Sequence, residues 1–381
     1  MPTRAASTGG VLGPRALNRA LLARQMLLRR RRLPPLAAVE RLIALQTQVP
    51  RDPYVALWSR LDRFRPEGLS KAIADRRAVR MTLLRATLHL VTARDALALR
   101  PLFQPVVERM FFGQRAFRRS AEGVDLDEVV ELFRQRLEEQ PRTRAELARA
   151  VTERWPDRDA SSLGYAMYLL PTVQVTPRGL WRTPGRAAVT SLEHWLGGPL
   201  ETAPSLQSLV TRYLAAFGPA TPADLGSWSG LAGTAEVLEG LRPRLRVFRD
   251  DRGRELFDVP RAALPDPKTP APVRFLPEFD NVALGHADRS RIVPEGVQQW
   301  TEVGWATVLV DGFIAARWKL ERQKDLATLR VEPFRPLARK EKAEVADEGA
   351  RLMSFLEPDA GRRDLRVEGL RKGARSPRFT R

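Results

Sequence analysis

The chain has 381 residues, of which 43% are hydrophobic and 29% charged, a balance that excludes a mainly disordered protein. It has no cysteine, which excludes disulfides, thiolate metal sites and cysteine nucleophiles, and three widely spaced histidines, which make a histidine-rich metal site an unfavourable reading. Lysine and arginine number 64 against 45 acidic residues, giving a net charge of +19.

This positive field attracts a polyanion, so we expect a nucleic acid as the partner. A GC-rich genome would explain why arginine outnumbers lysine, but it does not explain the excess of positive charge. No run of about 18 uncharged apolar residues occurs, so we expect no membrane span.

The amino-terminal 30 residues divide into an arm and a helix. Residues 1–13 are polar and glycine-rich, which is typical of a loose arm. Leu17, Leu21 and Leu28 fall on one face at helical spacing, so we predict a helix from about Pro14 to Arg30. The apolar stretch before the basic run at 29–32 faintly resembles a targeting peptide, but the amphipathic pattern favours an ordinary helix and a cytoplasmic protein.

The next segment is the least regular of three similar units. We predict a helix from Leu36 to about Gln46, helical segments from Tyr54 to Ala74, and a hairpin formed by residues 79–83 and 86–92.

The second unit is more regular. Val129, Phe133 and Leu137 belong to a single apolar helical stripe, and Thr143 with Glu146 has the spacing of a capping box that begins the next helix. A third helix carries the apolar residues between 163 and 170. Residues 173–175 and 180–182 then read as a hairpin around a turn at 177–179.

The third unit repeats this order. The stripe lies between Leu206 and Phe217, Thr221 and Asp224 supply a cap, and Thr234 is expected to cap the following helix. Residues 245–249 and 255–257 form the predicted hairpin. Helix, capped helix, helix and hairpin is the order of a winged helix-turn-helix. A generic α+β protein with the same elements by chance is the alternative.

The carboxyl-terminal part has a different pattern. A proline-rich linker at 264–272 precedes short predicted strands at 274–276, 307–310, 313–319 and 326–331, with an Asp311-Gly312 hairpin turn. A charged helix from Ala338 to Leu356 follows, and the basic tail from Gly369 is expected to be disordered.

Two glutamines stand out near the end of the predicted second helix. The apolar stripe of Val39, Leu42 and Ile43 leads to Gln46, where an amide takes the place of a hydrophobe. If the chain is extended beyond Gln46, Gln46 and Gln48 project together; if it stays helical, they diverge by about 200°. Gln46 satisfying a backbone group in the core is the alternative to a functional pair.

At this point the sequence resembles the AlkZ/YcaQ-type winged-helix DNA glycosylases. The matches keep a consistent order from about residue 20 to 320. They are Ala23-Arg24-Gln25, Leu45–Pro50, Leu57–Leu61, Leu84–Val91, Thr221–Leu225, Trp228–Leu231, Leu276–Asn281, His286–Ile292 and Val310–Phe313.

The resemblance implies an α+β fold with three tandem winged-helix units around a central antiparallel β-structure. We accordingly divide the chain into a first unit at 14–120, a second at 121–200, a third at 201–260 and a β-rich scaffold at 261–381. It also implies a monofunctional glycosylase that removes N-alkylated purines, especially N7-alkylguanine, and unhooks some interstrand crosslinks. Its catalytic signature is a pair of glutamines around an aliphatic residue, matched here by Gln46 and Gln48 around Thr47.

Further residues are expected to contact DNA. Arg60, Arg85 and His89 are candidates for phosphate contacts, with structural ion pairing or a hairpin position as the alternative. The segment 286–292 resembles the family's DNA-contacting hairpin. Its expected DNA-binding residues are His286, Asp288, Arg289 and Arg291. Arg289 and Arg291 would point to one side of a strand.

These readings predict a monomer that acts on damaged double-stranded DNA in the cytoplasm, in association with the nucleoid, without a metal or cofactor. A non-catalytic DNA-binding protein, either a regulator or a lesion-binding factor, is the alternative. A regulator would bind one sequence tightly, as a dimer on a palindrome.

Overall fold

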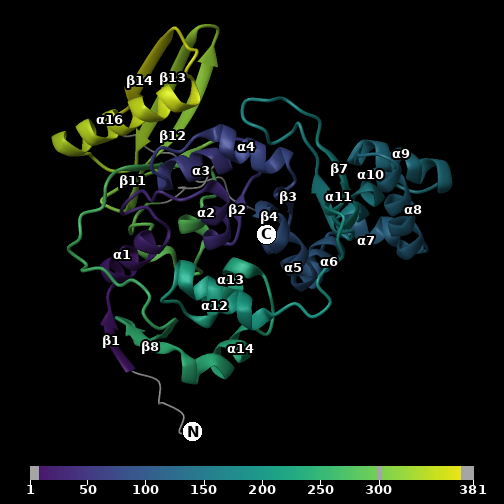
Figure 1. The fold of residues 1–381 in the computed structure, drawn as a ribbon, viewed down its shortest axis with the longest axis horizontal. Helices are drawn as coiled ribbons and strands as arrows, with labels where there is room; N and C mark the ends of the chain where they lie inside the picture. Colours follow the sequence, from purple (N-terminus) through teal and green to yellow (C-terminus); the bar gives the residue numbers. More distant parts are fainter. Residues whose placement is uncertain (1–7, 298–302, 370–381) are drawn as a thin grey trace.

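The computed structural model describes residues 8–297 and 303–369, and these form a mixed α and β protein with three sheets. In Figure 1 a six-stranded sheet occupies the middle, a five-stranded sheet with helix α16 extends to the top, and a three-stranded sheet lies at the bottom. None of the described helices is both long and apolar enough to cross a membrane.

The six-stranded sheet joins the first and second predicted units. Every neighbouring pair in it is antiparallel. Its strands, in spatial order, are β2 (Leu45–Gln46), β4 (Leu88–Thr92), β3 (Ala78–Thr82), β6 (Thr172–Gln174), β7 (Ala188–Ser191) and β5 (Arg142–Thr143). The predicted hairpin of the first unit is therefore confirmed as β3 and β4. The pairing of β3 with β6 carries the sheet from one unit into the next.

Two helices of the first unit end earlier than predicted, whereas the helical segments predicted from Tyr54 to Ala74 are confirmed. They are α1 (Pro14–Arg24), α2 (Pro35–Leu42), α3 (Asp52–Arg60), α4 (Pro66–Ala74), α5 (Ala93–Leu99) and α6 (Gln104–Gly113). Helix α1 ends at Arg24 rather than near Arg30, and Met26 has a positive φ of 60°. Helix α2 ends at Leu42 because Ile43 adopts φ 71°, so the predicted helix through Gln46 is wrong, and Gln46 lies in a strand.

The second unit confirms its local features and corrects one long-range pairing. Helix α7 (Arg115–Ala121) ends at the start of this unit, whose own helices are α8 (Leu126–Glu139), α9 (Arg144–Arg154), α10 (Ala160–Leu163) and α11 (Leu192–Leu196), with a 3₁₀ turn η3 (Gly164–Tyr168). The α8 stripe is buried, and Thr143 and Glu146 form the predicted capping box. The strand that returns to β6 is β7, so the prediction of residues 180–182 is wrong; Trp181 instead packs against Tyr54 and Phe355.

The third unit gains a strand from the amino terminus. Its elements are α12 (Leu206–Phe217), α13 (Pro222–Ser229), α14 (Thr234–Leu241), β8 (Arg246–Asp250) and β9 (Glu255–Asp258). Thr221 and Asp224 form the predicted capping box, whereas the N-cap of α14 is Gly233 rather than Thr234. Strand β1 (Thr8–Leu12) pairs in parallel with β8, so that part of the expected loose arm is ordered into the sheet; residues 1–7 lie outside the described chain.

The carboxyl-terminal sheet confirms the four predicted strands and adds a fifth. It contains β10 (Arg274–Leu276), β11 (Ala306–Val310), β12 (Phe313–Gln323), β13 (Leu326–Pro333) and β14 (Arg362–Val367), with helix α16 (Arg339–Leu356). Asp311 and Gly312 both have positive φ, 47° and 84°, which suits the tight turn between β11 and β12. Strand β14 joins β13 in parallel. The tail after Gly369, expected to be disordered, lies outside the described residues.

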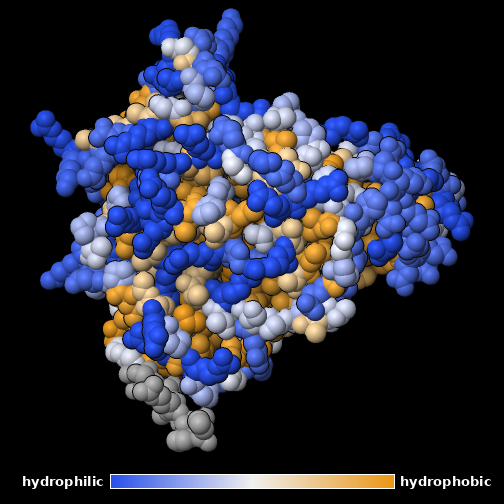
Figure 2. Space-filling view, viewed as in Figure 1, coloured by the Kyte–Doolittle hydropathy of each residue, from blue (hydrophilic) through white to orange (hydrophobic). Residues whose placement is uncertain are grey.

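Helices followed by strands thus recur in the three units, and the tandem winged-helix arrangement stays a prediction. The largest hydrophobic cluster joins α1, the strands β3 and β4, and the helices α12 to α14. It holds the six-stranded sheet against the third unit. On the face in Figure 2, hydrophilic side chains cover the outer helices α7 to α10, and hydrophobic patches lie nearer the middle.

Candidate active site

The two glutamines lie on an extended segment at the edge of the six-stranded sheet. Gln46 pairs with His89 across β2 and β4, and the Thr47 N–H donates to the carbonyl of Leu88 at 2.9 Å, so the pairing continues through Thr47. Burial alternates along the segment: Gln46 is half-buried, Thr47 buried and Gln48 exposed. Strand β2 ends at Gln46 and the chain bends at Gln48, and the pairing through Thr47 favours both glutamines on one side because alternate side chains of an extended chain share a side. The helical alternative, in which they diverge, does not occur.

Arg85 holds the amide of Gln46. Its Nη2 donates to Gln46 Oε1 at 3.0 Å, and its Nη1 donates to the carbonyl of Trp228. Arginine has no acceptor, so the amide oxygen of Gln46 must face Arg85 and the NH2 group must point elsewhere. Arg85 lies in the 3₁₀ turn η1 (Leu84–Ala86) with φ 51°. Burial, and then the charge of Arg289, lower the pKa of Arg85 to about 10, so it is a cation at neutral pH.

Thr47, between the glutamines, is held by a second buried arginine. Arg80 Nε donates to Thr47 Oγ1 at 3.2 Å, and Arg80 Nη2 donates to the Thr47 carbonyl at 2.9 Å. Burial, followed by the charge of Arg178, lowers the pKa of Arg80 to about 10. The hydroxyl that replaces an aliphatic side chain therefore has a partner, and the peptide that leads into Gln48 is fixed from behind.

Gln48 lines a cavity of about 330 Å³ between the first and second units. Its walls come from strands β3, β4, β6 and β7, from the turn at η1, and from α9 and η3. The residues that line it are Gln48, Arg80, Met81, Thr82, Ala86, Thr87, Leu88, Arg144, Met167, Tyr168, Thr172, Gln174, Ala187 and Val189. The exposed glutamine of the pair therefore borders a partly open cavity with both polar and apolar walls.

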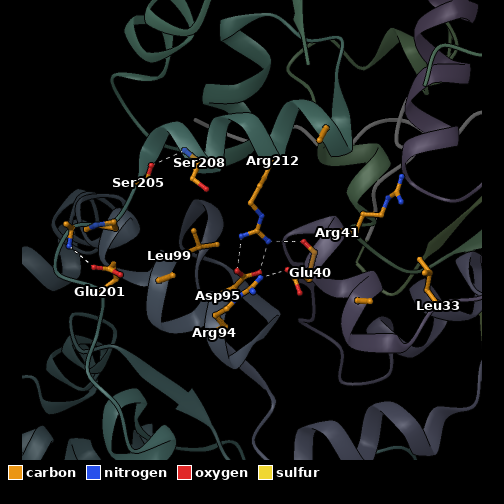
Figure 3. A pocket seen from close by; sticks show the side chains of 15 residues that line it. Leu33, Glu40, Arg41, Arg94, Asp95, Leu99, Glu201, Ser205, Ser208 and Arg212 are labelled. Atoms are coloured by element: carbon orange, nitrogen blue, oxygen red, sulfur yellow. Dashed lines mark hydrogen bonds and ion pairs between the residues drawn. The ribbon is translucent and has the colours of Figure 1, made fainter. Parts of the chain in front are cut away.

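A larger cavity of about 890 Å³ lies between α2, α5 and α12 (Figure 3). Arg212 crosses it and donates to both carboxylate oxygens of Asp95, at 2.8 and 2.7 Å, and to the carbonyl of Glu40 at 2.8 Å. Its central charges already satisfy one another, and neither glutamine of the pair lines it. We therefore place the candidate site at the smaller cavity.

His89 lies beside the glutamines but is buried. Its Nδ1–H donates to the carbonyl of Thr87 at 2.8 Å. Burial, and then the charge of Arg85, lower the pKa of His89 to about 3, so the ring is neutral at physiological pH. Its burial and neutral charge correct the expectation that His89 contacts a phosphate; its ring bonds to the carbonyl of Thr87, directly after the turn at η1, and supports that turn.

Arg60 is also internal. It is completely buried, and its Nη1 and Nη2 donate to the two carboxylate oxygens of Asp280 at 2.9 and 2.7 Å. This ion pair joins α3 to the segment that follows β10. The structural alternative considered for Arg60 therefore describes it, and a DNA contact by this side chain is not compatible with its burial.

The segment 286–292 is not the hairpin that the resemblance implied. It follows the short helix α15 (Asn281–Leu284) and contains a 3₁₀ turn η5 (Arg289–Arg291), in which Arg289 is exposed and Arg291 is buried. The buried Arg291 donates to the carbonyl of Pro219 at 2.9 Å, and His286 Nε2–H donates to that of Phe217 at 3.1 Å. His286 and Arg291 consequently belong to the core, and the prediction that Arg289 and Arg291 share a strand face is wrong.

Asp288 begins this turn. Its Oδ1 accepts from the Ser290 N–H at 3.0 Å, and its Oδ2 accepts from Arg252 at 3.2 Å and from Arg254. Asp288 is half-buried, and its neighbours Ala287, Arg289 and Ser290 are exposed. Burial raises the pKa of Asp288, but the hydrogen bonds from Ser290 and then Arg254 outweigh it and hold that pKa well below its ordinary value.

Sequence reasoning missed Arg80 and Gln174. Arg80 lies between Val79 and Met81 in an otherwise apolar strand, and a buried charge in such a run was the signal that could have identified it. Gln174 gave no such signal, because its position beside Arg80 depends on the pairing of β6 with β3. Among residues 8–297 and 303–369, no group of three side chains is placed to hold a metal ion.

Comparisons with known proteins agree with this architecture. The sequence model of the family described as DNA glycosylase AlkZ-like matches residues 39–355. No curated protein matches the sequence. Among solved structures, the chain is similar to the DNA glycosylase AlkZ of Streptomyces sahachiroi, with a TM-score of 0.69 and 19% identity, covering 94% of this chain and all of the other; this likeness concerns the fold. On the match over most of its length, the chain belongs to the AlkZ-like DNA glycosylase family.

Proposed function

We propose that the protein is a monofunctional DNA glycosylase that hydrolyses the N-glycosidic bond of N-alkylated purines, above all N7-alkylguanine, in duplex DNA. The observation that carries the proposal is the segment that pairs with β4 through Thr47, which carries Gln46 and Gln48 on either side of that residue, with Gln48 exposed at a cavity. Membership of the family supports the reaction class.

The chemistry suits two neutral amides. An N7-alkylguanine carries a positive charge, so its bond to C1′ is already weakened and no strong acid is needed to protonate the leaving base. Water oxygen attacks C1′, the C1′–N9 bond breaks, and its electron pair neutralises the base. One water proton passes to solvent, leaving a hydroxyl on C1′. The enzyme must position the water and stabilise the oxocarbenium-like sugar.

The contacts of the two glutamines divide these tasks. Arg85 donates to the amide oxygen of Gln46, so the NH2 group of Gln46 is the part of the amide that is left to face the sugar. Gln48 is exposed, so its carbonyl oxygen is available to accept a hydrogen bond from the attacking water. Both residues contribute to water positioning and sugar stabilisation in this scheme. The nearest lysine in sequence, Lys71, is exposed and paired with Asp75, so it does not support a Schiff-base step.

The same proposal covers the mode of DNA binding. Three winged-helix units in one chain would hold damaged duplex as a monomer, without sequence readout, in the nucleoid. A guanine crosslinked through N7 has the same cationic ring, so the reaction extends to crosslinks that allow the sugar to reach the glutamines. Repeated helices and strands in the three units and the net charge of +19 support this mode of binding.

The test is a base-release assay on duplexes that carry one N7-methylguanine. We expect wild type to leave an abasic site, and Gln46→Ala or Gln48→Ala to lower the single-turnover rate by about 100-fold while DNA binding persists. Gln135→Ala is the matched control, because Gln135 is an exposed glutamine on α8 that bonds to Glu131. Unchanged rates in both site variants, or tight binding to one operator without base release, would contradict the proposal.

A further inference from the structure

Two residues that line the cavity beside Gln48 each have a buried polar atom without a partner in the described part of the protein. Within the described chain, neither Gln174 Oε1 nor Arg80 Nη1 has a hydrogen-bond partner. Both residues line the cavity. Leaving a buried donor and a buried acceptor unpaired costs folding free energy, so such atoms are typical of sites completed by a ligand.

The two residues are neighbours across the sheet. Arg80 on β3 is the register partner of Gln174 on β6, and directly opposed residues project to the same face. A residue with an unpaired donor is therefore the cross-strand neighbour of a residue with an unpaired acceptor, and both line the cavity. Met81, Met167 and Tyr168 supply apolar wall around them, and the volume of about 330 Å³ lies in the range of small-ligand sites.

We propose that this cavity binds the alkylated guanine after the base leaves the duplex stack, and that Gln174 and Arg80 read its Watson–Crick edge. The inference rests on the proposed glycosylase function and names the base-binding part of that site. Guanine presents the O6 acceptor beside the N1–H and N2–H donors. Arg80 donates to O6, and Gln174 Oε1, with two lone pairs, accepts from N1–H and N2–H.

The charge of Arg80 agrees with this role. During bond breaking, positive charge moves from the alkylated base to the sugar, so repulsion between Arg80 and the base is relieved as the reaction proceeds. An interaction that becomes less unfavourable in the transition state accelerates the chemical step. Arg80 also holds Thr47, so its substitution would disturb the glutamine pair, and Gln174 is the better residue to test.

The first experiment compares two lesions with the same labile, cationic ring but different edges. Duplexes carry either N7-methylguanine or N7-methyladenine at one position, and single-turnover base release is measured for wild type and Gln174→Met. Methionine keeps the length of the side chain and removes the acceptor. We expect wild type to favour the guanine lesion, and the variant to lose about tenfold on guanine with little change on adenine. Gln135→Met on the surface of α8 is the matched control.

A second measurement uses the free base and needs no catalysis. Calorimetric titration with 7-methylguanine should show binding to wild type and to Gln135→Met, and at least tenfold weaker binding to Gln174→Met. If 7-methylguanine binds with this pattern but wild type releases no base from DNA, the proposed reaction is overturned and the cavity assignment stands. Base release by wild type, with Gln174→Met equal to it on both lesions and in the titration, would overturn the cavity assignment alone. If Gln174→Met does not fold, equal affinity of wild type for 7-methylguanine and 7-methyladenine decides against it.

Discussion

Two regions of this molecule bury arginine in opposite ways. Where α1 and α3 meet the later part of the chain, Arg24 is bound by both carboxylate oxygens of Asp258, and Arg60 by both of Asp280. Around the glutamine pair, Arg80 and Arg85 are bound by a hydroxyl, carbonyls and an amide oxygen. In the described chain, neither of these two forms a salt bridge.

The difference shows which arginines belong to the scaffold and which to the site. A carboxylate cancels the charge it binds, so the first region holds the fold together without attracting DNA. Neutral partners satisfy the hydrogen bonds of the second region and leave its positive charge in place, in a setting where low dielectric makes that charge felt. The net charge of the whole chain therefore overstates how many arginines can attract a polyanion. The positive field is strongest near arginines whose partners are uncharged.

The largest expected effect is on the ion-paired region. Asp280→Ala removes the partner of a fully buried guanidinium, so we expect the free energy of unfolding to fall by about 3–5 kcal/mol in urea denaturation. The same variant also removes the cap of α15. A loss below about 1 kcal/mol would mean that Arg60 finds water or another partner, and the contrast between the two regions would fail.

The second prediction concerns pH and compares the buried histidines of the two regions. The pKa of His89, near Arg85, and of His286, near Asp224, is lowered to about 3, first by burial. Below about pH 6.5 the unfolded chain binds protons that the folded chain does not, so stability falls as pH drops toward 3, by roughly 1.4 kcal/mol per pH unit and histidine. We expect His89→Gln and His286→Gln each to flatten this slope relative to wild type in urea melts.

The control for this prediction is His194→Gln, because His194 is exposed. It should leave the slope unchanged. Equal slopes for all four proteins would show that carboxylates alone set the pH dependence, and that the buried histidines do not differ from the exposed one.

A smaller effect is expected at Arg85. Arg85→Met removes the donor that orients the Gln46 amide, so the rate of base release at saturating DNA should fall about tenfold, with a smaller change in the DNA concentration needed for half saturation. Arg76→Met, at an exposed arginine that stacks on Trp195, is the control. A change in DNA affinity alone would assign Arg85 to phosphate binding rather than to positioning of Gln46.

The smallest effect belongs to an exposed pair. Lys71 Nζ and Asp75 Oδ2 lie 3.1 Å apart at the carboxyl end of α4, and the two side chains are 73% and 37% exposed. Lys71→Ala should change the free energy of unfolding by less than about 0.5 kcal/mol in the same urea assay. An effect near that of Asp280→Ala would remove the distinction between buried and surface pairing.

Local sequence rules predicted the elements whose causes are local. The capping boxes at Thr143 and Thr221 and the Asp311-Gly312 turn depend on residues within a few positions of one another, and all three are present. The end of α2 was misplaced because Ile43, a β-branched residue, adopts a positive φ that its sequence does not suggest. Tertiary packing decides that conformation.

Long-range pairing accounts for the rest. Residues 180–182 follow β6 after a short turn and were predicted to pair with it, but β6 pairs with β7, which lies further along the chain. Strand β14 is a charged segment that forms a strand by pairing with β13. Gln46 was noticed from its place on an apolar stripe, and the catalytic role of the pair came from the family resemblance, whereas Arg80 and Gln174 come together only when β3 pairs with β6. A side chain that acts through a partner from another segment leaves little trace in its own neighbourhood.

The shared six-stranded sheet also constrains how this protein can change. Strand β3 of the first unit pairs with strand β6 of the second. Neither unit can therefore be exchanged for a foreign module without leaving unpaired backbone groups on the remaining strand. Recombination at residue 120 would cut through a single hydrogen-bonded ladder. New specificities are therefore more accessible through point substitutions along these two strands, where one altered side chain faces the cavity while the backbone stays paired.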